Sequence, residues 1–173
     1  MMRHAHIALV TGGARSGKSA LAERLVLQQG GGRVYIATAQ AFDDEMSQRI
    51  QQHKDRRDQG WITVEEPVDL VGVLSATDGQ GTRLVDCLTL WLSNTMGQAD
   101  IAALVAVLRQ QRDPVVLVTN ELGLGIVPDN ALARQFRDAH GWMNQAVAEV
   151  ADEVWMAVCG QPLRIKPAPA GQP

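Results

Sequence analysis

The sequence has few cysteines, no excess of positive charge and no long hydrophobic run. Its only two cysteines, Cys87 and Cys159, each lack a second ligand at metal-binding spacing and lie in apolar segments. We therefore expect both to be small core residues rather than metal ligands or a disulfide. No segment approaches the ~20 apolar residues of a transmembrane helix. The N-terminus lacks a signal-peptide pattern, so a cytoplasmic location is expected.

The composition describes an ordinary globular protein of one domain. The chain has 173 residues, of which 46% are hydrophobic and 20% charged, and this length fits a single domain. The formal net charge of −3 gives no bulk electrostatic reason to expect nucleic acid as a partner. Any phosphate binding must therefore come from local geometry.

Apolar segments and helical patterns alternate along the chain. Strands are predicted at Ile7–Thr11, Val34–Thr38, Trp61–Glu65, Leu84–Asp86, Val115–Thr119, Val154–Val158 and, at an edge of the sheet, Leu163–Lys166. Helices are predicted at Lys18–Leu27, Asp43–Arg57, Asp69–Ala76, Ile101–Gln111 and after Pro128, where one apolar face contains Leu132, Phe136, Ala139, Met143, Val147 and Val150.

This alternation predicts an α/β fold of three layers, with helices on both faces of a mostly parallel sheet. The chain has no internal repeat and no interdomain linker. Residues 1–166 are therefore expected to form one domain. The tail at residues 167–173, rich in Pro, Ala and Gly, is expected to be disordered.

A complete phosphate-binding motif lies between the first predicted strand and the first predicted helix. Residues 12–19 read Gly12-Gly13-Ala14-Arg15-Ser16-Gly17-Lys18-Ser19 and match G-x-x-x-x-G-K-[ST] in full. Glycines let backbone N–H groups close around a phosphate, and the following helix adds its positive N-terminal end. Lys18 is expected to reach the β- and γ-phosphates, and the Ser19 hydroxyl to bind Mg²⁺.

Asp86 ends the apolar segment that begins at Leu84. A carboxylate at this position beside a phosphate-binding loop can hold Mg²⁺ through water, and oxygen ligands suit that ion. An aspartate at a strand end is also a common turn or cap residue. The phosphate-binding loop favours the metal role, so Ser19 and Asp86 are the candidate Mg²⁺ ligands.

The segment from Asp43 to Arg57 places a histidine among cations. His53 shares a predicted helical stripe with Met46 and Ile50, and Lys54, Arg56 and Arg57 follow it. One interpretation is a solvated charged helix whose histidine borders the core. The other is a nucleophile, since neutral imidazole can attack phosphorus while nearby cations disfavour its protonation and stabilise a triphosphate. The spacing alone leaves both open.

Several segments together resemble one known family. They are Thr11–Ser19, Tyr35–Ala39, Asp44–Met46 with Arg49, Ile50 and His53, Thr119–Pro128, Arg134 with Phe136–Asp138, Gly141 with Asn144 and Gln145, and Ala151–Val154. In this order they are similar to the adenosylcobinamide kinase / adenosylcobinamide-phosphate guanylyltransferase family. The resemblance runs from about Ile7 to Lys166.

The resemblance implies a RecA-like P-loop fold, a homotrimer and two reactions. The first transfers the γ-phosphoryl of ATP or GTP to adenosylcobinamide. The second transfers GMP from GTP through a guanylylated His53, giving adenosylcobinamide-GDP. It also implies that the nucleotide contacts Ala37, Thr38, Ala39, Lys54, Asp55, Arg56, Arg57 and Glu65, besides residues 12–19 and Asp86.

Two alternative functions remain open at the level of sequence. A plain P-loop small-molecule kinase would use the same loop and leave His53 structural. A nucleotide-sensing regulatory protein would bind the nucleotide without transforming it. A plain kinase would carry no protein-bound GMP, whereas the bifunctional enzyme would. A sensing protein would not turn over adenosylcobinamide, whereas either enzyme would.

Overall fold

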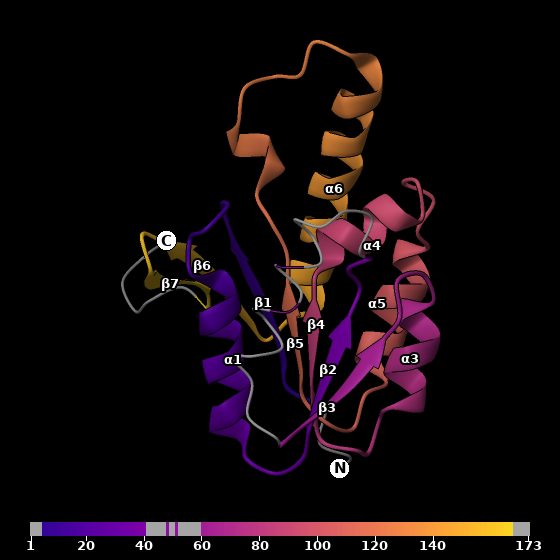
Figure 1. Ribbon diagram of the computed structural model, residues 1–173, viewed down its shortest axis with the longest axis vertical. Coiled ribbons are helices and arrows are strands. Elements are labelled where there is room, and N and C mark those ends of the chain that lie inside the picture. The colour runs from indigo at the N-terminus through magenta and orange to yellow at the C-terminus, as the bar shows by residue number, and fades with distance from the viewer. Residues whose placement is uncertain (1–4, 41–47, 49–50, 52–59, 168–173) are drawn as a thin grey trace.

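A seven-stranded sheet forms the centre of the molecule in the computed structural model, which describes residues 5–40, 48, 51 and 60–167 (Figure 1). The strand order is β3-β2-β4-β5-β1-β6-β7. The strands are β1 (Ile7–Gly12), β2 (Arg33–Ala37), β3 (Trp61–Glu65), β4 (Thr82–Asp86), β5 (Val115–Val118), β6 (Glu153–Val158) and β7 (Gln161–Lys166). Every neighbouring pair is parallel except β6–β7, which is antiparallel at the edge.

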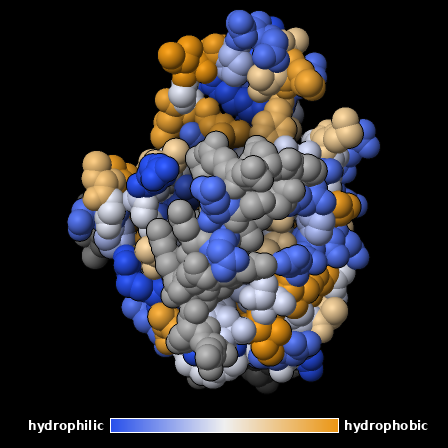
Figure 2. Space-filling view, in the orientation of Figure 1, coloured by the Kyte–Doolittle hydropathy of each residue, from blue (hydrophilic) through white to orange (hydrophobic). Residues whose placement is uncertain are grey.

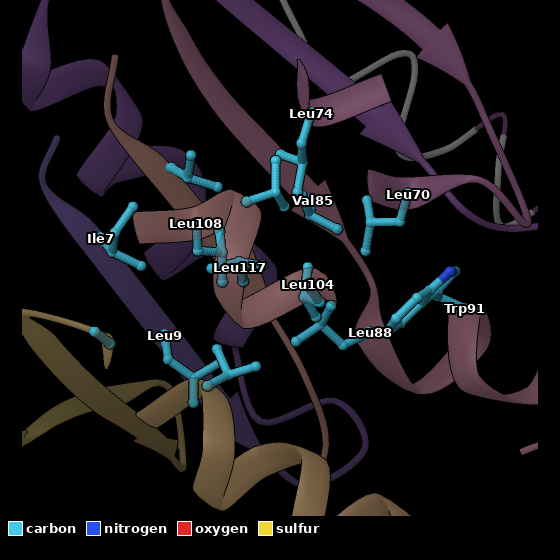
Figure 3. Close-up of a cluster of buried hydrophobic side chains, with 14 of the residues drawn as sticks. Ile7, Leu9, Leu70, Leu74, Val85, Leu88, Trp91, Leu104, Leu108 and Leu117 are labelled. Atoms are coloured by element: carbon cyan, nitrogen blue, oxygen red, sulfur yellow. The ribbon is translucent and has the colours of Figure 1, made fainter. Parts of the chain in front are cut away.

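Helices cover both faces of this sheet. They are α1 (Lys18–Gln29), α3 (Leu70–Ala76), α4 (Leu88–Asn94), α5 (Ile101–Arg109) and α6 (Ala131–Val150), with a short 3-10 helix, η1 (Leu122–Leu124). Side chains alternate along β1, so Ala8 and Val10 pack with α1 while Ile7 and Leu9 join the larger core with α5 and α6 (Figure 3). The predicted three-layer α/β fold with a mostly parallel sheet is confirmed.

The predicted strands all form, but two short elements escape prediction. Helix α4 has only seven residues, and its N-cap Cys87 makes no side-chain cap bond. A short apolar segment without a capping residue gives neither a helical period nor a start signal. The same holds for the three residues of η1. The helix predicted at Asp43–Arg57, except for residues 48 and 51, and the tail at residues 168–173 lie outside the described residues.

Helix α6 begins at a side-chain cap and projects beyond the sheet. Asn130 Oδ1 accepts from the backbone N–H of Ala133 at 2.8 Å. Met143 and Val147 are fully buried, as the predicted apolar face requires. Leu132 on that face is 77% exposed instead, which corrects the prediction. The reason is that the first turns of α6 rise above the sheet and have no core beneath them (Figure 1).

A buried ion network closes the amino edge of the sheet. Arg83, at the start of β4, is fully buried and lies 3.1 Å from Asp78 and 3.6 Å from Asp113. Its guanidinium also donates to the side chain of Gln111. Arg112 reaches Asp78 from outside at 3.0 Å. Partners on several sides compensate the burial of the Arg83 charge.

Candidate active site

The phosphate-binding loop connects β1 to α1, as its sequence predicts. Gly12 and Gly17 have φ angles of +154° and +94°. A Cβ at Gly12 would lie 2.5 Å from Ser16 Oγ and 2.8 Å from the Ala157 carbonyl oxygen. Only glycine therefore fits at this position. The loop is also held from the β6–β7 turn, where the Gly160 N–H donates to the Ser16 carbonyl at 2.9 Å.

Polar groups of the loop are directed towards a phosphate position. Lys18 Nζ donates to the Gly13 carbonyl at 3.0 Å, which places the ammonium over the loop. The Ser16 hydroxyl oxygen is buried and has no hydrogen-bond partner among the described residues. Helix α1 begins at Lys18, and Ser19 is its second residue. Both lie in the first turn, where backbone N–H groups have no acceptor within the helix. This arrangement is a ready anion site.

Asp86 ends β4 at the same edge of the sheet as the loop. Its Oδ2 accepts from the Tyr35 hydroxyl at 2.6 Å, a partner that the sequence did not indicate. Among the described residues, Asp86 has no ion-pair partner within 4.0 Å. The carboxylate therefore offers hard oxygen donors that no described cation occupies, and such donors fit Mg²⁺.

Residues at the end of β2 lie beside Asp86. Ala37 and Thr38 are buried, and the Thr38 N–H donates to the Asp86 carbonyl at 3.1 Å. The Thr38 hydroxyl donates to the Cys87 carbonyl at 2.8 Å. Ala39 follows them at the carboxyl edge, and the exposed Glu65 ends β3 at the same edge, in register with Ala37. The structure thus brings 12–19, 37–39, 65 and 86 to one edge.

Part of the predicted site cannot be placed. His53 and the run Lys54–Arg57 lie outside the described residues, so their predicted roles stay predictions. No group of three potential His, Cys, Asp or Glu ligands occurs in the described part of the chain.

The two cysteines differ in their surroundings. Cys87 is buried, and this burial raises the pKa of its thiol to about 12, so it stays protonated. Cys159 is exposed at the β6–β7 turn, with a φ of +52°. The prediction that Cys159 is a core residue is therefore wrong. The apolar segment before it ends in a tight turn, which turns its side chain outwards.

A second carboxylate at this edge was not predicted as a site residue. Glu121 follows β5 by three residues, and its Oε1 accepts from the Thr11 hydroxyl at 2.8 Å. Thr11 directly precedes the phosphate-binding loop. Polar residues directly after the buried strand Val115–Val118 were the available signal, since parallel strands bring their carboxyl ends to one edge.

A hydrogen-bond network fixes the residue before Glu121. The Asn120 backbone N–H and side-chain amide donate to Thr89 Oγ1 at 3.2 and 3.0 Å. The Asn144 side-chain amide donates to the Asn120 carbonyl at 2.9 Å. Two acceptances fill the lone pairs of the Thr89 hydroxyl, so its own proton goes to His140 Nε2, at 2.8 Å.

His140 is therefore an acceptor, and a neutral ring, in this network. Thr119 Oγ1, 3.2 Å from the same nitrogen, donates its proton to Asn144 Oδ1. Burial lowers the pKa of His140, although the charge of Glu121 acts in the opposite direction. A neutral His140 leaves the Glu121 charge uncompensated. Sequence periodicity had placed no functional group at His140.

No helix in the described part of the chain is long and apolar enough to cross a membrane.

Comparison with solved structures supports the fold. A protein of Pyrococcus horikoshii OT3 superposes with a TM-score of 0.54 over 94% of this chain and 86% of its own, at 10% identity. At that identity the likeness concerns the fold alone.

Comparison with known sequences covers nearly the whole chain. A bifunctional adenosylcobalamin biosynthesis protein CobP of Pseudomonas aeruginosa is 44% identical over 171 residues, covering 93% of this chain and 98% of that protein. A bifunctional adenosylcobalamin biosynthesis protein CobU of Salmonella typhimurium is 44% identical, covering 91% and 98%. A family profile described as cobinamide kinase / cobinamide phosphate guanyltransferase matches residues 8–165. The chain belongs to this family of bifunctional kinases and guanylyltransferases.

Proposed function

We propose that this protein carries out both reactions of its family on adenosylcobinamide, with one covalent step. ATP or GTP first gives its γ-phosphoryl group to the hydroxyl of the aminopropanol arm. GTP then gives GMP to the phosphorylated corrinoid, and adenosylcobinamide-GDP forms. The observation that carries the proposal is the phosphate-binding loop beside Asp86 and Thr38 at one edge of the sheet.

The kinase reaction uses the phosphate-binding loop and the residues around it. The backbone N–H groups of residues 13–19 surround the phosphates, and Lys18 Nζ leaves the Gly13 carbonyl for the β- and γ-phosphates. Ser19 and Asp86 would hold Mg²⁺, which supplies positive charge against the phosphates when bound. The nucleotide also contacts 37–39, Lys54–Arg57 and Glu65. Positioning and charge stabilisation provide most of the rate.

The guanylyl transfer uses His53 as a nucleophile. A neutral ring nitrogen of His53 forms a bond to the α-phosphorus of GTP, and the bond to the bridging oxygen breaks as pyrophosphate leaves. The phosphate oxygen of the corrinoid then attacks the same phosphorus and releases the imidazole. A covalent intermediate divides one difficult displacement into two easier ones. The support is the family motif and the cations Lys54, Arg56 and Arg57 beside His53.

Labelled GTP tests the intermediate directly. GTP labelled at the α-phosphate should leave label on the protein, and γ-labelled GTP should leave none through this step. The bond should be lost in acid and retained in base, as for a phosphoramidate. His53→Ala should abolish the label and guanylyl transfer while much of the kinase activity remains. His6→Ala is the matched control, because His6 lies at the amino end of β1, away from the loop.

Two outcomes would contradict this mechanism. Label that persists on His53→Ala would mean another nucleophile. Equal loss of both reactions in a well-folded His53→Ala protein would make His53 part of a shared nucleotide site. A protein that phosphorylates adenosylcobinamide but never carries GMP would be the plain kinase.

We also propose that the enzyme is a homotrimer, as the family resemblance implies. Residues 122–136 rise above the sheet, and Figure 2 shows apolar side chains gathered there. Leu124, Ile126 and Leu132 are 74%, 97% and 77% exposed in the single chain. Contact with other copies would remove this apolar surface from water. Light scattering tests this proposal, because it gives the mass of the assembly in solution.

A cytoplasmic location is likewise proposed, and cell fractionation tests it.

A further inference from the structure

The carboxylate of Glu121 has no role in the reactions as described above, yet it lies beside the phosphate-binding loop. Its Oε1 accepts from the hydroxyl of Thr11, the last residue before Gly12. Its other oxygen has no hydrogen-bond partner among the described residues, and no described cation lies within 4.0 Å of the carboxylate. Glu121 is therefore an oriented carboxylate, and one of its oxygens is not bonded by any described group.

The backbone that presents Glu121 is held on both sides. Asn120 is bonded to Thr89 of α4 and to Asn144 of α6, and Thr119 pairs with β1 through its N–H and the Val10 carbonyl at 2.9 Å. The residue before Glu121 therefore cannot turn away without loss of three hydrogen bonds. A group held in this way is preorganised.

Glu121 also contacts the face of the sheet from which a phosphoryl acceptor could approach. Thr11 follows Ile7 and Leu9 on the face covered by α5 and α6, whereas α1 covers the opposite face. Phosphates bind at the N-terminus of α1. In phosphoryl transfer the attacking and leaving oxygens lie roughly in line across the γ-phosphorus. An acceptor that comes from the side away from α1 would meet Glu121.

We propose that Glu121 is the general base of the kinase reaction. Its free oxygen takes the proton of the corrinoid hydroxyl as that oxygen forms a bond to the γ-phosphorus. The bond between the γ-phosphorus and the β,γ-bridging oxygen breaks, and the nucleoside diphosphate leaves with that electron pair. The proton on Glu121 then passes to water.

Asp86 is less suited to this role. Its Oδ2 accepts from the Tyr35 hydroxyl, and the proposed Mg²⁺ site uses its charge. The two acids would then divide the work, with Asp86 on the metal and Glu121 on the proton. The inference rests on the kinase half of the proposed function.

The test compares Glu121→Gln with Glu149→Gln in the full-length protein. Glutamine keeps the size of Glu121 and an oxygen that can accept from Thr11, so the fold should survive. Glu149 is an exposed glutamate on α6 and serves as the matched control. The measurements are kcat and KM for phosphorylation of adenosylcobinamide by ATP, ATP binding, and self-labelling with α-labelled GTP.

We expect Glu121→Gln to lower the kinase kcat by about 10²–10⁴-fold, the usual contribution of a general base. ATP affinity and GMP labelling should stay within about threefold of the wild type, as both should in Glu149→Gln.

Three results would overturn the role. A kcat for Glu121→Gln within about threefold of the wild type would exclude a base at this position. Equal losses in ATP binding, labelling and kcat would make Glu121 a structural residue. A wild-type protein that labels with GMP but phosphorylates no corrinoid would refute the kinase half of the proposed function, and this role with it. A wild-type protein that phosphorylates the corrinoid but takes up no GMP label would contradict only the guanylyl-transfer half of the proposed function.

Discussion

The two edges of the sheet both carry acidic residues, but with different partners. At the amino edge, Asp78 lies within 3.1 Å of Arg83 and 3.0 Å of Arg112. At the carboxyl edge, Asp86 accepts from the hydroxyl of Tyr35 at 2.6 Å, and Glu121 accepts from that of Thr11 at 2.8 Å. A single five-residue strand, β4, connects the two situations.

The difference shows how position alone does not make a carboxylate functional. Arginine cancels the charge of a carboxylate, so the amino-edge network stabilises the fold and offers nothing to a ligand. A hydroxyl orients a carboxylate and stabilises its ionised form but leaves the charge in place. Charge that is oriented but not cancelled can act on Mg²⁺ or on a proton. We therefore assign stability to the amino edge and chemistry to the carboxyl edge.

A large loss of kinase activity is expected from Lys18→Ala. The ammonium is the described cation that lies over the phosphate-binding loop. Its loss should reduce the kinase rate by about 10²–10³-fold while the fold remains intact. Lys166→Ala is the control, because Lys166 donates to the carbonyls of Ala148 and Glu149 instead. Near-normal turnover by a folded Lys18→Ala protein would mean that the phosphate site lies elsewhere.

The next effect concerns stability at the amino edge. Asp78→Asn should reduce the free energy of unfolding by about 3 kcal/mol, since it removes one partner of the buried Arg83 charge. Kinase turnover per folded molecule should not change. Urea unfolding followed by circular dichroism gives the first quantity, and turnover of the folded protein gives the second. A stability loss below about 0.5 kcal/mol would show that the network is dispensable.

The Asp78 carboxylate also makes the stability of the fold depend on pH. Burial alone would raise the pKa of Asp78, but hydrogen bonds from Asp113 and Arg112 and the charge of Arg83 lower it below the usual 3.8. The folded state then binds fewer protons than the unfolded state. The stabilisation is complete above about pH 3.8 and is lost as the pH falls through the lower folded-state pKa. Asp78→Asn should lack this part of the acid dependence.

Sequence reasoning predicts the groups whose chemistry is local. The phosphate-binding loop requires glycines and a lysine at fixed spacing, and Asp86 follows directly from the end of a buried strand. Cys159 was assigned wrongly because periodicity does not show where an apolar strand enters a tight turn. The partners of Asp86 and Glu121 come from β2 and β1, 51 and 110 residues away in sequence. Only the pairing of strands reveals such contacts.

The most direct test of this comparison measures Asp86→Asn and Asp78→Asn side by side. Both remove one negative charge from residues at opposite ends of the same part of the sheet. For each variant, a Mg²⁺ titration of nucleotide-dependent kinase turnover is paired with urea unfolding. We predict that Asp86→Asn needs about tenfold more Mg²⁺ for half-maximal turnover and loses under about 1 kcal/mol of stability. Asp78→Asn should keep the wild-type Mg²⁺ requirement and lose about 3 kcal/mol of stability. An unchanged Mg²⁺ requirement in Asp86→Asn would contradict the account and return Asp86 to the role of a turn residue.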